Sequence, residues 1–320
     1  MFVPVNEPVV NEDDINAVVK TMRDGWISSE GPVVSEFESA FAEYCNRDYG
    51  ISCTNGTHAL VMALQALNLP KGSTVLCPAL TIMSCAIAIL EAGCIPSFVD
   101  VDKATYNIDI NSLRDSIDED TSALIVVHTY CHPCEMDEIQ ELCNKRGIKI
   151  IEDAAEMHGQ QYRGQMCGSF GDVSTFSFYP NKQITTGEGG MVLTDDVIIS
   201  NRLVKLRNLG FDNSRRFYHE EIGSNYRMTS LQAALGNSQL KRISEIVDRK
   251  KAIGNYYDAN LSLPDFIVKP PVSTDYSENI YWVYPLVINH YDIDSRDIMS
   301  ALGQNGIGSR PFFFSLAHQP

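Results

Sequence analysis

The stretch Ser174-Thr175-Phe176-Ser177-Phe178-Tyr179-Pro180-Asn181-Lys182 joins an apolar run to a turn that ends on a lysine. The turn continues through Thr185-Thr186-Gly187-Glu188-Gly189-Gly190, and a second apolar run begins at Met191. Lys182 is therefore predicted to lie in a loop between two buried strands. Partial desolvation of such a lysine lowers its pKa and makes the amine a nucleophile suited to Schiff-base chemistry. A solvated loop lysine is the commoner alternative.

The alternation of apolar runs and helical patterns extends outward from this loop. Helix-length segments between buried strands indicate βαβ crossovers and a largely parallel sheet, in an α/β fold. Ligands bind at the carboxyl ends of such strands. The predicted strands are Thr74–Cys77, Pro96–Asp100, Ala123–His128, Lys149–Glu152, Ser174–Ser177 and Met191–Thr194, and the predicted helices are Gly56–Leu67, Ile82–Ala92, Asn111–Ser116 and Met136–Arg146.

A long helical pattern over Thr229–Leu261 leads into the last part of the chain. Thr229 or Ser230 is expected to cap it. We expect a large domain over residues 1–240 and a smaller C-terminal α+β domain over residues 241–320. The smaller domain is predicted to hold a strand at Tyr281–Ile288 and a helix at Ser295–Gln304. Because the chain stops after a loop, we expect this domain to be incomplete, with a truncated C-terminus.

The composition narrows the class of protein. Of the 320 residues, 44% are hydrophobic and 21% charged, which is ordinary globular usage. The 41 acidic and 25 basic residues give a net charge of −16, which argues against nucleic acid or an anionic membrane as a partner. The uncharged stretch Gly72–Leu90 contains Pro78 and several hydroxyl residues, so it is a poor membrane span.

The cysteines and the N-terminal residues indicate in which cellular compartment the protein is located. Nine cysteines, an odd number, are spread over predicted strands and helices. Reduced thiols in a cytoplasmic protein are the simplest explanation. The stretch Met1–Asp13 carries acids and prolines where a secretory signal needs a basic start and an apolar run. We therefore predict a cytoplasmic location.

Two further features carry candidate chemistry. Cys53-Thr54-Asn55-Gly56-Thr57 is a small polar turn that runs directly into an apolar helix, and the N–H groups of a helix start form a phosphate site. Asp153 follows the apolar run Lys149–Glu152 at the carboxyl end of a strand. A carboxylate there pairs with a cationic heterocycle nitrogen. Ordinary helix caps are the alternative interpretation of both features.

Taken together, the three features match one cofactor. Pyridoxal phosphate requires an anion site, a carboxylate for its pyridinium nitrogen and an amine for its aldehyde. The turn at Gly56, the strand-end Asp153 and the loop Lys182 offer these groups in an α/β chain.

The run Phe176–Gly190 resembles the lysine motif of the DegT/DnrJ/EryC1/StrS family of pyridoxal-phosphate-dependent sugar aminotransferases. The resemblance covers essentially the whole chain and includes Trp26–Gly31, Glu152–Glu156 and Gly223–Thr229. Within the family the chain is most similar to the GDP-perosamine synthases, with which it shares the Trp26 loop, His128–Cys134, Glu156 and Arg310–Phe313. The resemblance implies fold type I of the pyridoxal phosphate enzymes, as in aspartate aminotransferase.

The family pattern implies a role for each cofactor-binding position. Lys182 forms the Schiff base and moves the proton, and Asp153 keeps the pyridine nitrogen protonated. Glu156 lies near the phenolic oxygen, and Ile82 takes the place where the family often has an aromatic ring stacked on the cofactor. Phosphate contacts are implied for Gly56, Thr57, Ser177 and, from the neighbouring subunit, Asn225. The last contact implies a homodimer with shared active sites.

The resemblance also implies the reaction. Glutamate is the expected amino donor, and a nucleotide-linked 4-keto-6-deoxy sugar is the expected acceptor, for the biosynthesis of a surface polysaccharide or glycan. Arg215, Arg216 and Arg227 are candidates for the diphosphate, although the first two fit a solvated surface run equally well. Trp26, Ser28 and Ser29 are implied to line the sugar pocket.

Three other interpretations of the sequence are possible. In the dehydratase branch of the fold a histidine replaces the lysine, so Lys182 argues against a sugar dehydratase. A cofactor-binding sensor or non-enzymatic remnant stays open because of Ile82 and the short C-terminus. The cluster Cys131-His132-Pro133-Cys134 lacks a second ligand pair, so no metal site is predicted. Tyr281 and Trp282 are expected to pack at the domain junction.

Overall fold

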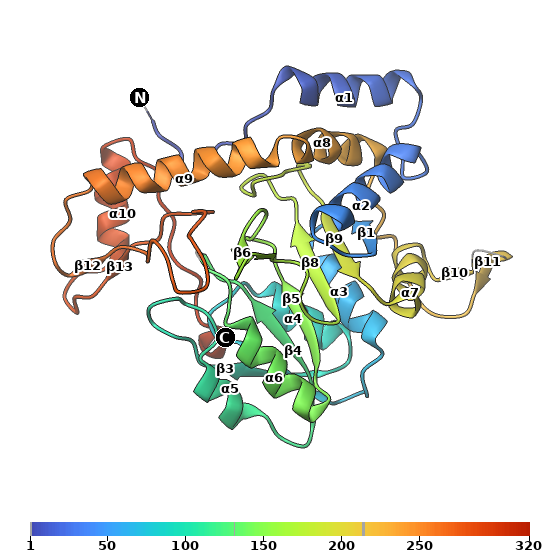
Figure 1. The fold of residues 1–320 in the computed structure, drawn as a ribbon, viewed down its shortest axis with the longest axis horizontal. Helices are drawn as coiled ribbons and strands as arrows, with labels where there is room; N and C mark the ends of the chain where they lie inside the picture. Colours follow the sequence, from blue (N-terminus) through green and yellow to red (C-terminus); the bar gives the residue numbers. More distant parts are fainter. Residues whose placement is uncertain (1, 131, 213–214) are drawn as a thin grey trace.

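A seven-stranded mixed sheet forms the centre of the computed structural model, which describes residues 2–130, 132–212 and 215–320 (Figure 1). The strand order is β1-β9-β8-β5-β4-β2-β3, and β9 runs antiparallel to both of its neighbours. The other pairings are parallel, which confirms the predicted mostly parallel α/β sheet. The strands are β1 (Tyr49–Cys53), β2 (Thr74–Pro78), β3 (Ile95–Val99), β4 (Thr121–Val127), β5 (Lys149–Asp153), β8 (Val173–Ser177) and β9 (Gly190–Thr194).

Helices cover both faces of this sheet, because strand residues alternate between two apolar surfaces. Ile151 and Val173 pack with the helices of one face, whereas Ile150 and Phe176 pack on the other. The first face is covered by α3 (Gly56–Leu67), α4 (Ser84–Glu91) and α7 (Val197–Arg207). The second is covered by α2 (Pro32–Tyr44), α5 (Ile110–Ser116) and α6 (Met136–Arg146).

The long helical pattern forms two helices instead of one. These are α8 (Ser230–Leu240) and α9 (Ile243–Asn260), and Thr229 caps the first as expected, in a capping box with Gln232. Arg242 leaves the helical conformation at φ −118°, and its Nη2 donates to Asp14 Oδ2 on α1 (Glu12–Arg23) at 2.6 Å. The predicted single helix was wrong because this tertiary ion pair interrupts it. Both helices run along one edge of the molecule (Figure 1).

The C-terminal part agrees with the prediction only in its helix, α10 (Ser295–Gln304). The predicted strand Tyr281–Ile288 shrinks to β13 (Val287–Ile288), which pairs with β12 (Ile267–Val268). Tyr281 has φ +53°, and its N–H donates to Asn279 Oδ1 at 2.7 Å, so an extended strand cannot start there. The remaining short elements are the pairs β6 (Gln161–Tyr162) with β7 (Gln165–Met166) and β10 (Phe211–Asp212) with β11 (Arg215–His219), and the 3₁₀ turn η1 (Leu316–His318).

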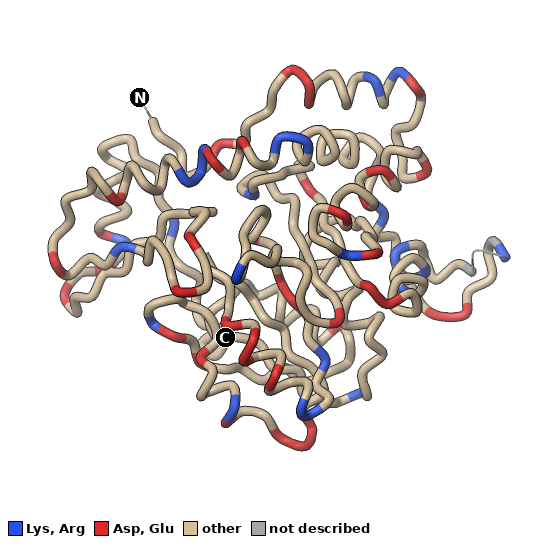
Figure 2. The backbone as a smooth tube through the Cα atoms, in the orientation of Figure 1, with Lys and Arg blue, Asp and Glu red and all other residues tan. Residues whose placement is uncertain are grey.

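Acidic residues outnumber basic ones, 41 to 25, and residues of both signs are scattered along the fold (Figure 2). Of the helices in the described part of the chain, none combines the length and the hydrophobicity that a bilayer span needs.

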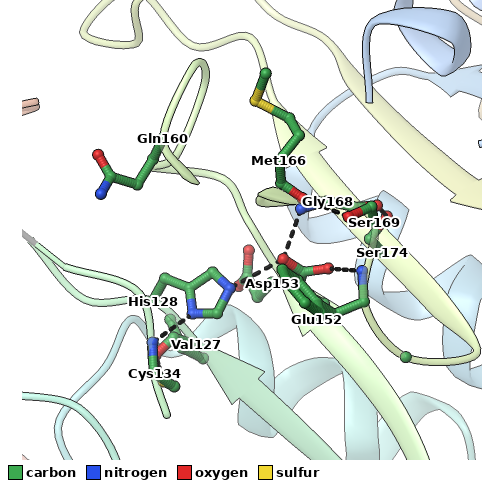
Figure 3. A network of polar contacts seen from close by, with 12 residues as sticks. Val127, His128, Cys134, Glu152, Asp153, Gln160, Met166, Gly168, Ser169 and Ser174 are labelled. Carbon is green, nitrogen blue, oxygen red and sulfur yellow. Dashed lines mark hydrogen bonds and ion pairs between the residues drawn. The ribbon is translucent and has the colours of Figure 1, made fainter. Parts of the chain in front are cut away.

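A buried polar network ties β5 to its neighbours (Figure 3). Glu152 Oε1 lies 2.9 Å from His128 Nε2 and accepts from the N–H of Gly168 at 2.6 Å, while its Oε2 accepts from the N–H of Phe170 at 2.8 Å. The N–H of Cys134 donates to His128 Nδ1 at 3.0 Å, so Nε2 carries the proton toward Glu152. The carboxylate therefore acts as an acceptor on every side.

We predict that Glu152→Gln lowers the free energy of unfolding by about 2–4 kcal/mol, because the new amide group would place a donor against a backbone N–H donor. Glu43→Gln, an exposed change on α2, is the control and should shift stability by less than about 0.5 kcal/mol. Chemical denaturation measures both. Equal stability of the two variants would contradict this account of the network.

Candidate active site

The start of α3 lies against the end of β8. Asn55 caps the helix, its Oδ1 accepting from the N–H of His58 at 2.8 Å. A Cβ atom at Gly56 would lie 2.8 Å from Ser177 Cβ, so only glycine allows the helix start to come this close to the strand. The Thr57 hydroxyl lies 2.7 Å from that of Ser84. The structure thus brings together the helix terminus and the hydroxyl groups predicted to bind a phosphate.

Asp153 ends β5 on the face covered by α3 and α4. It is buried, and its Oδ1 accepts from the N–H of Ala155 at 3.2 Å. Cys85 Sγ lies 3.9 Å from its Oδ2. Burial raises the pKa of the Asp153 carboxyl, against the opposing effects of the Ala155 N–H and the positive charge of Lys182. Ile82 lies one turn before Cys85, whose N–H donates to the Ile82 carbonyl at 3.3 Å. Ile82 is 47% exposed.

Lys182 follows β8 in a turn closed by its N–H to the carbonyl of Tyr179, and the side chain is half-buried. Burial lowers the pKa of the amine, while the carboxylates of Glu156 and Asp153 act in the opposite direction. Burial also raises the pKa of Glu156 to about 7, despite the nearby Lys182 charge. The charges of Lys182, Asp153 and Glu156 therefore act on one another in one cluster.

His158 completes this cluster and was not predicted. Its Nδ1 accepts from Ile184 N–H at 3.3 Å, and the ring is buried. Burial, followed by the positive charge of Lys182, lowers the pKa of His158 to about 3. The ring is consequently neutral. His158 lies two residues after Glu156, and no sequence pattern around it indicates a place in the site.

Trp282 is the second residue that sequence reasoning missed. Lys182 Nζ lies 4.0 Å from the centre of its ring, and the indole Nε1 donates to the carbonyl of Asn181 at 2.9 Å. Trp282 is buried and stacks with Tyr130, so it packs as a core residue. No sequence pattern could indicate the contact between Trp282 and Lys182, because the two residues are far apart in the chain.

Other predicted site residues lie at the periphery of the single chain. Trp26 is 48% exposed, and the carbonyl of Ser28 accepts from Ser230 N–H at 2.7 Å, beside the half-buried Ser29. Asn225 is exposed and pairs with Asn208, whose Oδ1 accepts from Arg227 Nη1 at 2.6 Å.

Arg215 is exposed on the β10–β11 hairpin, which projects from the body (Figure 1), and its guanidinium lies over Tyr218. The side chain of Arg216 lies outside the described residues.

One group of side chains has the composition of a metal site. Ligand atoms of His128, Glu152 and Cys167 lie within 4.8 Å of one another in the described part of the chain. His128 Nδ1 accepts from Cys134 N–H, and both oxygens of Glu152 already accept hydrogen bonds, so this group is better explained as the polar network of Figure 3. In the short stretch Cys131-His132-Pro133-Cys134, Cys131 lies outside the described residues.

The arrangement fits pyridoxal phosphate. Because Gly56 has no Cβ, the start of α3 lies against Ser177, and its N–H groups with the Ser177 hydroxyl suit an anion. Asp153 offers a buried carboxylate, and Lys182 an amine of lowered pKa. When bound, this cofactor supplies an electron sink for chemistry at the carbon attached to an amine.

The sequence pattern of the DegT/DnrJ/EryC1/StrS aminotransferase family matches residues 8–320. The chain belongs to this family. GDP-perosamine synthase of Caulobacter vibrioides is 38% identical over 99% of this chain and 86% of its own length. The protein of that name from Escherichia coli O157:H7 is 35% identical over 100% of this chain and 86% of its own length.

Among solved structures, the one described as "Putative sugar aminotransferase Spr1654 from Streptococcus pneumoniae, PLP-form" is 26% identical and superposes with a TM-score of 0.92, over 99% of this chain and 86% of that one. Membership in the family confirms the predicted fold type I, the aminotransferase class and the cofactor.

We predict that Gly56→Ala weakens binding of pyridoxal phosphate at least tenfold, because the added Cβ pushes the start of α3 away from Ser177. Titration followed by absorbance measures the affinity. Gly303→Ala is the control, since a Cβ there meets no atom within 4 Å. Unchanged affinity in Gly56→Ala would contradict the proposed phosphate cradle.

Glu156 makes stability depend on pH. Its pKa is about 7 in the folded chain against an ordinary 4.5, so the folded state holds the proton more tightly. Its contribution to stability is complete below pH 4.5 and is lost as the pH rises through about 7. We predict that Glu156→Gln flattens the decline of unfolding free energy over this window, measured without added cofactor. Glu43→Gln should keep the wild-type slope, and a wild-type slope in Glu156→Gln would refute the raised pKa.

Proposed function

We propose that this protein transfers an amino group from glutamate to a nucleotide-linked 4-keto-6-deoxy sugar, in the manner of the GDP-perosamine synthases, for a surface polysaccharide or glycan. The observation that carries the proposal is the cluster of Lys182, Asp153 and Glu156 at the carboxyl edge of the sheet. Three relatives named GDP-perosamine synthase, 34–38% identical over nearly the whole chain, support the sugar.

The chain's own residues divide the work. Lys182, whose amine has a lowered pKa, would hold the cofactor through its Nζ with loss of water, and once free would move the proton between the donor carbon and the sugar carbon. Asp153 would keep the ring nitrogen protonated, and Glu156 would lie near the phenolic oxygen. The start of α3 and Ser177 would bind the phosphate. Ile82 would cover the ring without the stacking that an aromatic residue supplies.

We further propose a homodimer with shared active sites. Asn225 and Trp26 are exposed in the single chain, and the hairpin with Arg215 projects from it. In a dimer, Asn225 reaches the phosphate of the neighbouring site, and the arginines at 215, 216 and 227 meet the sugar diphosphate near Trp26, Ser28 and Ser29.

The proposed location is cytoplasmic. The described cysteines, which are Cys45, Cys53, Cys77, Cys85, Cys94, Cys134, Cys143 and Cys167, are all free and buried, as expected of reduced thiols.

The test is a visible absorbance spectrum of the full chain with pyridoxal phosphate, then with glutamate and finally with a GDP-linked 4-keto-6-deoxy sugar. We expect a Schiff-base band that glutamate bleaches and the keto sugar restores. Lys182→Ala should lack the band, whereas the exposed Lys145→Ala should keep it. A band insensitive to glutamate would favour a cofactor-binding sensor. Turnover by Lys182→Ala at the wild-type rate would refute the assignment of the lysine.

A further inference from the structure

A single side chain contacts both the lysine and the residue before it. The Trp282 ring faces Lys182 Nζ at 4.0 Å, and its Nε1 donates to the carbonyl of Asn181 at 2.9 Å. Asn6 Nδ2 donates to the same carbonyl at 3.3 Å. The indole thus contacts two groups of this loop. Its N–H holds the backbone carbonyl that precedes the lysine, and its ring faces the amine at the end of the lysine side chain.

The position of the Trp282 ring is itself fixed by its neighbours, which are Tyr130 and residues of the C-terminal part. Tyr130 stacks on it with an interplanar angle of 9° and a centroid distance of 6.3 Å. The N–H of Tyr130 donates to Glu156 Oε2 at 2.6 Å, so the same residue orients a carboxylate of the site. Phe313 stacks on Tyr130 at 5.2 Å, and its N–H donates to the Tyr130 hydroxyl at 2.8 Å. Lys250 Nζ donates to the Trp282 carbonyl at 3.2 Å.

We propose that Trp282 is a positioning residue for Lys182: its ring holds the lysine ammonium whenever the lysine is not bonded to the cofactor, and its N–H fixes the loop carbonyl beside it. The role of the lysine rests on the proposed function, whereas the contact itself does not.

The balance of charges around the lysine explains why such a contact matters. Burial disfavours the ammonium, whereas the carboxylates of Asp153 and Glu156 favour it, and the neutral His158 packs nearby. The electron-rich face of an indole attracts a cation without adding a charge or a proton acceptor of its own. Trp282 therefore stabilises the protonated lysine between its proton transfers and keeps it within reach of the site.

Fluorinated tryptophan tests the contact without changing the volume of the ring. Fluorine withdraws electron density from the ring face, and the chain has only two tryptophans, Trp26 and Trp282. The pKa of Lys182 is measured from the pH dependence of its labelling by acetic anhydride in the cofactor-free full chain, read by mass spectrometry. We expect the pKa to fall stepwise as the number of fluorine atoms grows, by up to about one unit.

The control is Trp282→Phe, in which only Trp26 carries the fluorine. Its Lys182 pKa should not depend on fluorination. An unchanged Lys182 pKa over the whole series in the wild-type chain would overturn the proposal. The Schiff-base band distinguishes this failure from that of the proposed function. A normal band together with a Lys182 pKa that does not change with fluorination refutes only the role of Trp282. A Lys182 pKa that falls with fluorination in a chain without the band refutes only the aminotransferase.

Discussion

Strand β5 ends on two consecutive carboxylates that point to opposite faces of the sheet, and the site depends on this alternation. Glu152 turns toward the face of Ile150, where it accepts hydrogen bonds from Gly168, Phe170 and His128. Asp153 turns toward the face of Ile151, under α3 and α4. Because side chains in a strand alternate with period two, a shift of one residue would exchange the two carboxylates. The network of Glu152 therefore fixes the register that places Asp153 on the face of α3 and α4, where we propose that it meets the cofactor.

The same sheet also places the other groups of the site. Gly56 allows α3 to approach Ser177, and Lys182 lies in the turn that follows the same strand. Neighbouring strands thus deliver the carboxylate, the anion site and the amine to one edge of the sheet. Trp282, from the C-terminal part of the chain, joins this edge only through tertiary packing.

Much of the fold was predictable because local signals and tertiary structure agree. The helices Gly56–Leu67, Met136–Arg146 and Ser295–Gln304 have the predicted bounds, and the order of the site motifs indicated the cofactor before any geometry. The failures have tertiary causes. The ion pair of Arg242 with Asp14 divides the long helix, and the left-handed backbone at Tyr281 shortens the last strand. Neither Trp282 nor His158 carries a local pattern that reveals its proximity to Lys182.

We propose that Lys182 is the residue that bonds to the cofactor. The most direct measurement is borohydride reduction of the chain loaded with pyridoxal phosphate, followed by peptide mass spectrometry. The account predicts a phosphopyridoxyl group on the peptide containing Lys182 and on no other lysine in stoichiometric amount. Stoichiometric labelling of a different lysine, with Lys182 unmodified, would contradict it.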